Sequence, residues 1–421
     1  MTAAPDLSGA VEDSVRSLTG RFLANHSHPA PRRYGLHIDG VGSWTVATGD
    51  GRCAVWWGQP GTVHAGLHTD AESWLAIVNG DLSGLDLFFR GVLQVTGDLN
   101  EALRLETMFA PPQGTPGESR RGRLVRYPLS ERARGRVVGL GDAAIDNVTV
   151  EALEAGPADG PVVIMLHGLG ASKVSLLPLV AGLSATHRVI ALDFPGFGKS
   201  SAPVGAPYDA AWFAKVVRRA MDAARVDQAF LVGNSMGGRV SVEVALQAPE
   251  RVRGIGLLCP AVAFDEYRLL RPFLQAARFD LALGVPGWKV PGPLPSWIVQ
   301  NGLRAMFADH RRVPAQNLEA AKLDFLRSID NRRRRMAFLS CSRRLGMESP
   351  GRFWPRLKDL DVPSYWIFGD HDRLVSPAYA EVVRRHCPQA KVEVWGSCGH
   401  VPQFEHPQLT NDRLTDFFDA I

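Results

Sequence analysis

The chain has 421 residues, of which 45% are hydrophobic and 21% charged, and its formal net charge is +4. At roughly 100–200 residues per domain, this length predicts two or three domains with at least one large buried core. The 42 Gly and 29 Pro follow no fixed period, which excludes a collagen-like chain. No apolar run approaches the ~20 residues of a membrane-spanning helix, and the acidic N-terminus lacks the features of a signal peptide. We therefore expect a cytoplasmic protein.

Charge is distributed unevenly along the sequence. Residues 1–112 contain twelve acidic residues, seven Arg and no Lys, a charge of −5, so the remainder carries +9. This asymmetry favours two modules with separate surfaces and does not indicate a nucleic-acid partner. The basic excess lies in Arg120–Arg136 and Arg332–Arg335, where solvated arginines and an anion-docking site are both open interpretations. The five scattered cysteines contain no CxxC pair, so we expect neither disulfides nor a bound metal.

Residues 1–112 read as a small α+β domain. Four strand-like runs separated by Gly-rich turns come first, and helical patterns beginning at Asp70 and Ser83 follow. A fifth strand-like run then leads to a last helical pattern beginning at Glu101. Asp70 is a predicted helix N-cap. The strand-like runs are residues 34–39, 43–48, 52–57, 62–68 and 92–97. A Pro/Gly/Arg-rich stretch, residues 113–140, has the composition of a linker.

Residues 141–421 predict a doubly wound α/β domain with a mostly parallel sheet. Nearly continuous apolar runs alternate with helical patterns, as expected for strands buried on both faces. The runs are residues 162–168, 188–193, 229–234, 254–259, 364–370 and 391–395. The interval of about 100 residues before 364 lacks such a run and predicts a helical lid over about 262–345. Its aromatic residues either line an acyl pocket or hold the lid together; they are Phe273, Phe279, Trp288, Trp297 and Phe307.

A G-x-S-x-G motif, Gly233 to Gly237, lies directly between an apolar strand and a helical pattern. In this context the motif forms a tight turn that presents its serine, Ser235, at the carboxyl edge of the sheet. A side chain on either glycine would clash in such a turn. Ser235 is thus the candidate nucleophile.

A nucleophilic serine needs a base and an orienting acid. His400 follows the strand at 391–395, on the same sheet edge as Ser235, and is preferred over His371 as the base. Asp370 and Asp372 both follow the strand at 364–369, and the spacing leaves either one open as the acid.

An oxyanion hole needs two backbone N–H groups. Met236 follows the nucleophile and supplies the first. Leu169, in the loop after the strand at 162–166, is the candidate for the second.

Together these motifs resemble the α/β-hydrolase fold family over about residues 145–421. The further matching motifs are His167-Gly168-Leu169-Gly170, the run from Asp193 to Ser200, and Gly369-Asp370-His371-Asp372. The family's usual spacing selects Asp372 as the acid, and the family hydrolyses without a metal or organic cofactor. Residues about 20–110 resemble the sterol carrier protein-2 family, which implies an apolar ligand such as a sterol or fatty acyl chain. A domain serving only solubility or oligomerisation is the alternative.

These resemblances imply a serine hydrolase of a hydrophobic carboxylic ester whose N-terminal domain binds lipid. Three alternatives stay open: a C–C bond hydrolase of ring-cleavage products, an acyltransferase, and a lipid carrier with a vestigial hydrolase. The expected partners are a small hydrophobic substrate and a lipid, without nucleic acid.

Overall fold

The computed structural model contains two compact units, each described here by itself. The first comprises residues 1–124, 154–159 and 184–186, and the second comprises 125–153, 160–183 and 187–421. The structure describes residues 7–24, 30–58, 61–82, 84–89, 91–110, 123–129, 145, 148–262, 296–313, 315–329, 331–347 and 350–421. Among the helices in these ranges, none is both long and apolar enough to cross a membrane.

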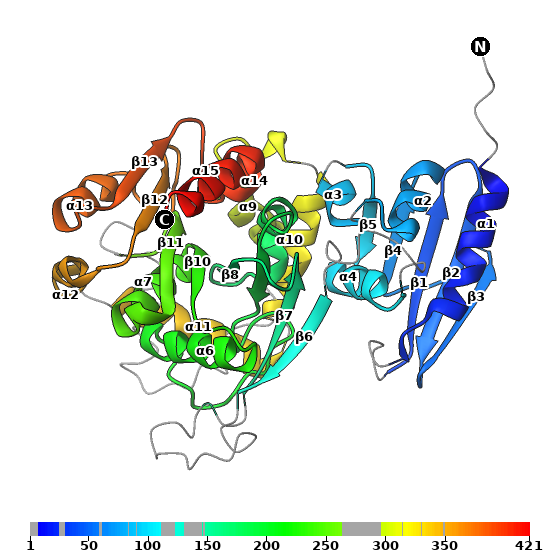
Figure 1. The fold of residues 1–421 in the computed structure, drawn as a ribbon, viewed down its shortest axis with the longest axis horizontal. Coiled ribbons are helices and arrows are strands. Elements are labelled where there is room, and N and C mark those ends of the chain that lie inside the picture. Colours follow the sequence, from blue (N-terminus) through cyan, green and yellow to red (C-terminus); the bar gives the residue numbers. More distant parts are fainter. Residues whose placement is uncertain are drawn as a thin grey trace. The chain divides into compact units, whose positions relative to one another are not determined.

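The first unit is the predicted α+β fold, built on a five-stranded sheet of order β3-β2-β1-β4-β5. β1 pairs antiparallel with β2 and parallel with β4. The strands are β1 (Arg32–Ile38), β2 (Gly42–Gly49), β3 (Arg52–Trp57), β4 (Ala65–Thr69) and β5 (Gln94–Gly97). The helices are α1 (Ser8–Ser17), η1 (Leu18–Arg21), α2 (Ala71–Asn79), α3 (Gly84–Phe89) and α4 (Leu99–Thr107), drawn in blue and cyan in Figure 1.

Asp70 is the N-cap of α2, as predicted. Its carboxylate accepts a hydrogen bond from Ser73 N at 2.8 Å, which satisfies a free donor of the first turn. α1 was not predicted from the sequence; its buried residues are Val11 and Val15. Two buried positions make a weak helical pattern, and a tertiary contact between α1 and α2 compensates: Trp74 Nε1 donates to Ser14 Oγ at 2.8 Å.

The second unit is a doubly wound α/β fold on an eight-stranded sheet of order β13-β12-β11-β10-β8-β9-β7-β6. The strands from β8 to β13 pair in parallel. α6 and α7 lie on one side of this sheet and α15 on the other (Figure 1). The strands are β6 (Arg123–Pro128), β7 (Thr149–Ala155), β8 (Val162–Leu166), β9 (Arg188–Leu192), β10 (Ala229–Asn234), β11 (Val252–Leu258), β12 (Ser364–Gly369) and β13 (Lys391–Trp395).

Helices cover both faces of this sheet, and their buried residues form one core with the strands. The helices of the core layers are η5 (Lys173–Leu176), α5 (Leu177–Leu183), α6 (Ala210–Ala223), α7 (Met236–Gln247), η6 (Pro249–Arg251), α12 (Pro350–Phe353), η9 (Trp354–Asp359), α13 (Tyr379–His386), α14 (Pro402–Glu405) and α15 (Pro407–Asp419).

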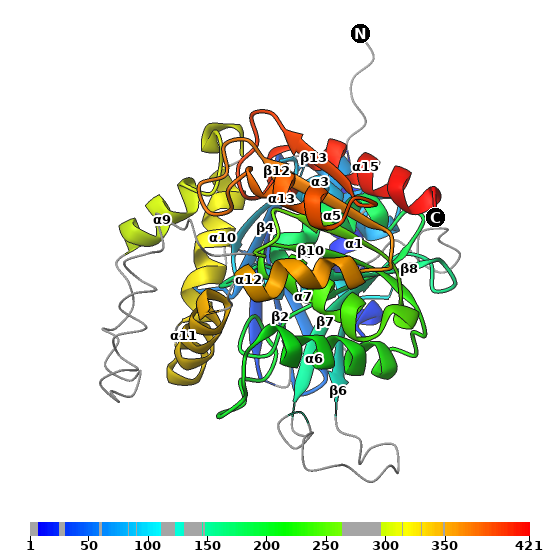
Figure 2. The ribbon, with the colours of Figure 1, turned by 90° about the vertical axis from the view of Figure 1, so that its left-hand side faces the viewer.

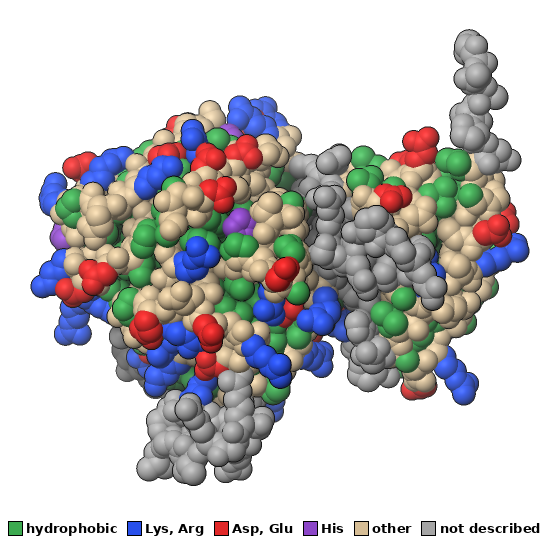
Figure 3. Space-filling model, viewed as in Figure 1, with side chains coloured by type: hydrophobic (Ala, Val, Ile, Leu, Met, Phe, Trp, Pro, Cys, Tyr) green, Lys and Arg blue, Asp and Glu red, His purple; other side chains and the backbone are tan. Residues whose placement is uncertain are grey.

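Part of the predicted linker, residues 113–140, is a strand. Residues 123–128 form β6, the edge strand next to β7. Arg123 and Arg126 hid this strand in the sequence, because charged side chains are unusual in a buried strand. At an edge they are tolerated: Arg126 Nε lies 3.2 Å from Glu151 Oε2 on β7. Elsewhere on the face of this unit in Figure 3, Lys and Arg alternate with Asp and Glu and do not gather in one patch.

Of the helices between β11 and β12, three α-helices among the described residues begin within the interval of the predicted lid. They are α9 (Ser296–Arg304), α10 (Ala315–Ser328) and α11 (Arg332–Met347), with the short η8 (His310–Arg312) between α9 and α10. α10 and α11 run along one side of the unit in Figure 2. Of the aromatic residues considered for a pocket, Trp297 is 65% exposed and Phe307 is buried beside Val313 and Val401. The other three, Phe273, Phe279 and Trp288, lie outside the described residues.

Candidate active site

Ser235 occupies a strained turn between β10 and α7. Its backbone has φ 53° and ψ −115°, a conformation that costs a residue with a side chain about 1–3 kcal/mol. Surrounding bonds hold it there. Ser235 N donates to Leu258 O on β11, and Ser235 O accepts from Ala261 N, each at 2.9 Å. α7 begins at the next residue, Met236, so the positive end of the helix dipole faces any negative charge that develops at Ser235.

The two glycines of the motif meet the steric requirement inferred from the sequence. A Cβ atom on Gly233 would lie 2.3 Å from the carbonyl carbon of Gly237. A Cβ atom on Gly237 would lie 2.1 Å from Leu166 O at the end of β8. Real Cβ atoms do not approach other atoms so closely, so any larger residue at either position would displace the backbone that carries Ser235.

His400 is paired with Asp372. Its Nδ1 donates to Asp372 Oδ2 at 2.8 Å, and both side chains are at most 3% exposed. The other carboxylate oxygen, Oδ1, accepts backbone N–H groups of Leu374 at 2.7 Å and Val375 at 2.9 Å. These bonds fix the carboxylate, and the carboxylate fixes the imidazole with its proton on Nδ1. Nε2 of His400 therefore has a free lone pair and can accept a proton.

Asp370, the other candidate acid, has different partners. Its Oδ1 lies 2.6 Å from His371 Nδ1 and also accepts from Cys398 N at 3.1 Å. His371, the rival base, is 58% exposed at this surface pair. The structure therefore brings Asp372 to His400 and leaves Asp370 and His371 away from it.

The loop of His400 is tied to the nucleophile turn through Asn234, the residue before Ser235. Asn234 Nδ2 donates to His400 O at 3.1 Å and to Leu258 O at 3.0 Å. A second support comes from Glu405, which accepts from Gly399 N and from Ala308 N, each at 2.7 Å. No hydrogen bond joins Ser235 Oγ to His400 in the part of the chain that the structure describes. Neither Asn234 nor Glu405 was predicted from the sequence as a residue of the site.

The loop after β8 is oriented by His167, which is fully buried. His167 Nδ1 donates to Gly168 O at 2.7 Å, and its Nε2 accepts from Phe194 N at 2.9 Å. Both ring nitrogens are therefore used by the neutral imidazole, and burial lowers the pKa of His167 to about 4. In a trans peptide the C=O and N–H point in opposite directions. Because Gly168 O points to the His167 ring, the N–H of Leu169 points away from that ring.

The N–H groups of Leu169 and Met236 have no acceptor among the described residues. The loop of Leu169 packs directly on the nucleophile turn, because a Cβ atom on Gly168 would lie 3.4 Å from Ser235 Cβ. Two unpaired N–H donors from adjacent loops are the arrangement that an oxyanion hole requires.

Helices α10 and α11 contact both of these loops. Ser172 Oγ donates to Asp324 Oδ2 on α10 at 2.7 Å, and Cys341 on α11 lies with its Sγ 3.1 Å from Met236 Sδ. The ring of Phe325 would lie 2.8 Å from a Cβ atom on Gly170. The helices between β11 and β12 therefore form walls next to the candidate nucleophile.

Asp193, directly after β9, anchors η5, the short helix that follows the loop of Leu169. Asp193 accepts from Lys173 N at 2.7 Å and from Lys173 Nζ at 2.6 Å, and Lys173 Nζ also donates to Glu151 at 3.1 Å. All three side chains are at most 1% exposed. Burial opposes the charge on Lys173, but the two carboxylates outweigh it and raise its pKa. The network ties β7, β9 and η5 together beneath the Leu169 loop, which is a structural role.

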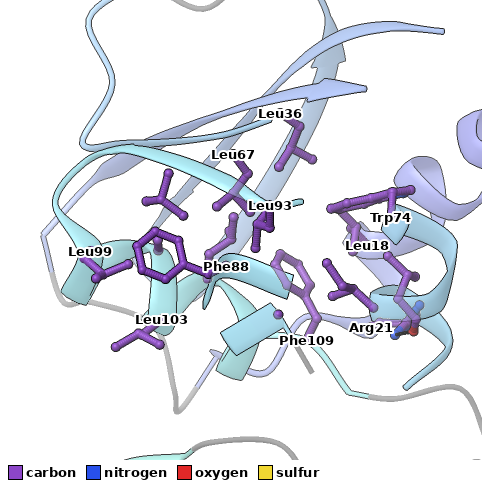
Figure 4. Close-up of a pocket in the computed structure, with 16 residues that line it drawn as sticks. Leu18, Arg21, Leu36, Leu67, Trp74, Phe88, Leu93, Leu99, Leu103 and Phe109 are labelled. Carbon is purple, nitrogen blue, oxygen red and sulfur yellow. Dashed lines mark hydrogen bonds between the residues drawn. The ribbon is translucent and has the colours of Figure 1, made fainter. Parts of the chain in front are cut away.

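The first unit contains a pocket between its sheet and its helices (Figure 4). Among the described residues, Arg21 is the only charged one that lines it, and this guanidinium donates to Val78 O at 2.9 Å and Ala110 O at 2.7 Å. The other lining residues are Leu18, Leu36, Leu67, Trp74, Ile77, Val78, Gly84, Phe88, Leu93, Val95, Leu99, Ala102, Leu103, Leu105 and Phe109. Such a lining fits the apolar part of a ligand.

Comparisons with known proteins assign both units. Residues 161–407 match the alpha/beta hydrolase fold, and residues 8–110 match the SCP-2 sterol transfer family. A 2-hydroxy-6-oxo-6-phenylhexa-2,4-dienoate hydrolase of Burkholderia cepacia is 28% identical over 320 residues, covering 69% of this chain and 98% of that protein.

Many solved structures resemble this chain, among them the following two. One, a membrane phospholipase A described as a bacterial virulence factor, has a TM-score of 0.53 and 28% identity, covering 65% of this chain and 84% of its own. The other, a dienoate hydrolase from Rhodococcus sp. strain RHA1, has a TM-score of 0.56 and 22% identity, covering 71% of this chain and all of its own, which shows the fold alone. The chain belongs to the alpha/beta hydrolase fold family and carries an N-terminal domain of the SCP-2 sterol transfer family.

Proposed function

We propose that this protein is a serine hydrolase in which Ser235, His400 and Asp372 form the catalytic triad. His400 Nε2 takes the hydroxyl proton as Ser235 Oγ attacks the substrate carbonyl, and Asp372 stabilises the imidazolium that forms. The N–H groups of Leu169 and Met236 hold the oxyanion. The protonated His400 then protonates the leaving group, and water cleaves the acyl-enzyme by the same route. The observation that carries this proposal is the buried 2.8 Å pair of His400 and Asp372.

The proposed substrate is a carboxylic ester with a hydrophobic acyl or alcohol part. The apolar pocket in the SCP-2 unit supports this choice, because its lining would retain a long aliphatic group out of water. The 28% identity to a protein described as a phospholipase A is a second support. In this proposal the SCP-2 unit binds lipid and raises its concentration near the hydrolase.

A second candidate is hydrolysis of a C–C bond in a ring-cleavage product. The similarity to the Burkholderia cepacia dienoate hydrolase favours it, since that relative matches this chain over almost its full length. Both reactions would use the same base and the same oxyanion donors, so the triad geometry does not distinguish them.

A substrate panel separates these candidates. The purified full-length protein would be given p-nitrophenyl esters from acetate to palmitate beside 2-hydroxy-6-oxo-6-phenylhexa-2,4-dienoate. We expect ester turnover that is highest for long acyl chains, and labelling of Ser235 by a fluorophosphonate. The Ser235→Ala variant should lose both signals, and Ser241→Ala, on α7, should keep both.

Other outcomes identify the alternatives. Faster turnover of the dienoate than of any ester would favour the C–C hydrolase. Acyl transfer to an added alcohol in preference to water would indicate an acyltransferase. Absence of both labelling and turnover would leave a lipid carrier.

A further inference from the structure

The SCP-2 unit holds a cluster of three side chains of the types that bind metals, on the face of its sheet opposite the pocket. His37 on β1 and His68 on β4 are directly opposite each other in the parallel pairing of these strands. Asp39 follows β1, and its Oδ1 lies 2.6 Å from His68 Nε2 and 3.6 Å from His37 Nε2. One potential ligand atom from each of the three residues lies within 4.8 Å of the other two.

Neighbouring groups hold these side chains in place. Ser43 Oγ on β2 lies 2.7 Å from His37 Nδ1, so the other ring nitrogen, Nε2, faces Asp39. Asp39 N donates to Thr69 O at 2.9 Å, which fixes the backbone after β1 next to β4. A hydrogen bond to the second nitrogen of a histidine is the usual support of a metal ligand, because it sets both the ring orientation and the tautomer.

The two distances from Asp39 to the histidines are close to those between ligand atoms around a bound ion. Metal–ligand bonds of about 2.0–2.1 Å in a tetrahedral site place the ligand atoms roughly 3.3 Å apart. His37 and Asp39 are near this separation already, and His68 and Asp39 reach it by moving less than about 1 Å apart. The side chains are 46%, 58% and 41% exposed for His37, Asp39 and His68, so an ion has access and water can complete its coordination.

We propose that His37, Asp39 and His68 form a binding site for one transition-metal dication, of which Zn²⁺ is the best match. Two imidazoles and one carboxylate suit zinc and its neighbours in the first transition row, whereas Mg²⁺ and Ca²⁺ prefer sites made of oxygen ligands. The cysteine pattern predicts no metal site, and this site contains no cysteine.

The site has a direct connection to the pocket. Successive residues of a strand point to opposite faces, and the residues before the two histidines, Leu36 and Leu67, line the pocket. They are also opposite each other in the β1–β4 pairing. An ion held by His37 and His68 would therefore clamp β1 to β4, two of the strands that line the pocket.

The test is titration of the EDTA-stripped full-length protein with Zn²⁺, followed by calorimetry, by metal analysis after dialysis, and by thermal unfolding. We expect one Zn²⁺ per chain and a rise of several degrees in the melting temperature of the SCP-2 unit. His37→Ala and His68→Ala should each lower the affinity at least tenfold and abolish the rise. Mg²⁺ at the same concentration should produce neither effect.

Two further variants keep the result interpretable. His64→Ala removes an exposed histidine of the same unit that lies outside the cluster and should bind Zn²⁺ as the unmodified protein does. Asp39→Asn keeps the side-chain shape and should weaken binding even if a histidine variant fails to fold. Failure to bind one Zn²⁺, or binding that survives the Asp39, His37 and His68 substitutions, would overturn the proposal.

Discussion

Replacing Asp372 with Asn tests the proposed triad at one atom. In the native structure Asp372 Oδ1 is held by the N–H groups of Leu374 and Val375, and Oδ2 accepts from His400 Nδ1. An asparagine keeps its single oxygen on the two N–H donors, because its NH₂ group cannot accept them. The NH₂ group must then face His400, and His400 can pair with it only by presenting Nδ1 as an acceptor. The proton moves to Nε2, which leaves His400 unable to accept the proton of Ser235.

The expected loss is large and is confined to catalysis. The corresponding substitution in serine proteases lowers kcat about 10⁴-fold, which is equivalent to ~5.5 kcal/mol of transition-state stabilisation. We expect a loss of this order for Asp372→Asn with p-nitrophenyl butyrate, with little change in KM. The rate of fluorophosphonate labelling should fall in parallel, because that reaction also needs the activated serine.

Asp370→Asn is the matched control. Asp370 is two residues away and bonds to His371 and Cys398, so its substitution should leave kcat within about threefold. If Asp372→Asn kept a tenth of the native activity, or if Asp370→Asn were the more damaging change, the assignment of the acid would be wrong.

Three further predictions concern other parts of the chain. Ser235→Ala should abolish turnover without altering the melting temperature, whereas Ser235→Gly should abolish turnover and raise the melting temperature by a few degrees, because glycine removes the strain at φ 53°. Burial opposes ionisation of Glu243, but hydrogen bonds from Arg356 and the charge of Arg239 outweigh it and lower its pKa from 4.5 to about 2. Urea unfolding at pH 7 should therefore show the Glu243→Gln variant to be about 3 kcal/mol less stable than the unmodified protein. This difference in unfolding free energy should shrink as the pH falls from 4.5 towards 2. A difference that stays constant over this range would refute the linkage. Ala102→Phe fills the SCP-2 pocket and should lower kcat/KM several-fold for p-nitrophenyl palmitate but not for p-nitrophenyl butyrate. The control Ala54→Phe, on the exposed side of β3, should change kcat/KM for neither ester. Equal losses on both esters would mean that the pocket does not serve the reaction.

The sequence predicts those strands whose own residue pattern reflects how they are buried. β8 to β12 are nearly continuous apolar runs because both faces of the sheet are covered, and such runs are visible without any structure. β6 was missed for the opposite reason. It lies at the sheet edge, where Arg123 and Arg126 pair with acidic residues of β7, and no local pattern reveals those partners.

The candidate site also contains residues that the sequence predicts and residues that it does not. Ser235 and His400 follow from motifs next to strand ends, where the topology of a parallel sheet gathers side chains on one edge. Asn234 and Glu405 act through hydrogen bonds to backbone atoms far along the chain, at His400 and Ala308. Residues that bind backbone atoms leave no signature in a single sequence, because every residue type supplies a carbonyl and every type except proline supplies an N–H.

The neutral His167 has a consequence for kinetics. Both of its ring nitrogens are engaged, and burial lowers its pKa to about 4, so the loop of Leu169 keeps its shape through the range in which an ordinary imidazole titrates. Only near pH 4 does a second proton reach this loop. That proton would break the bond from Phe194 N–H, and the activity lost there would follow a structural change and not a simple titration.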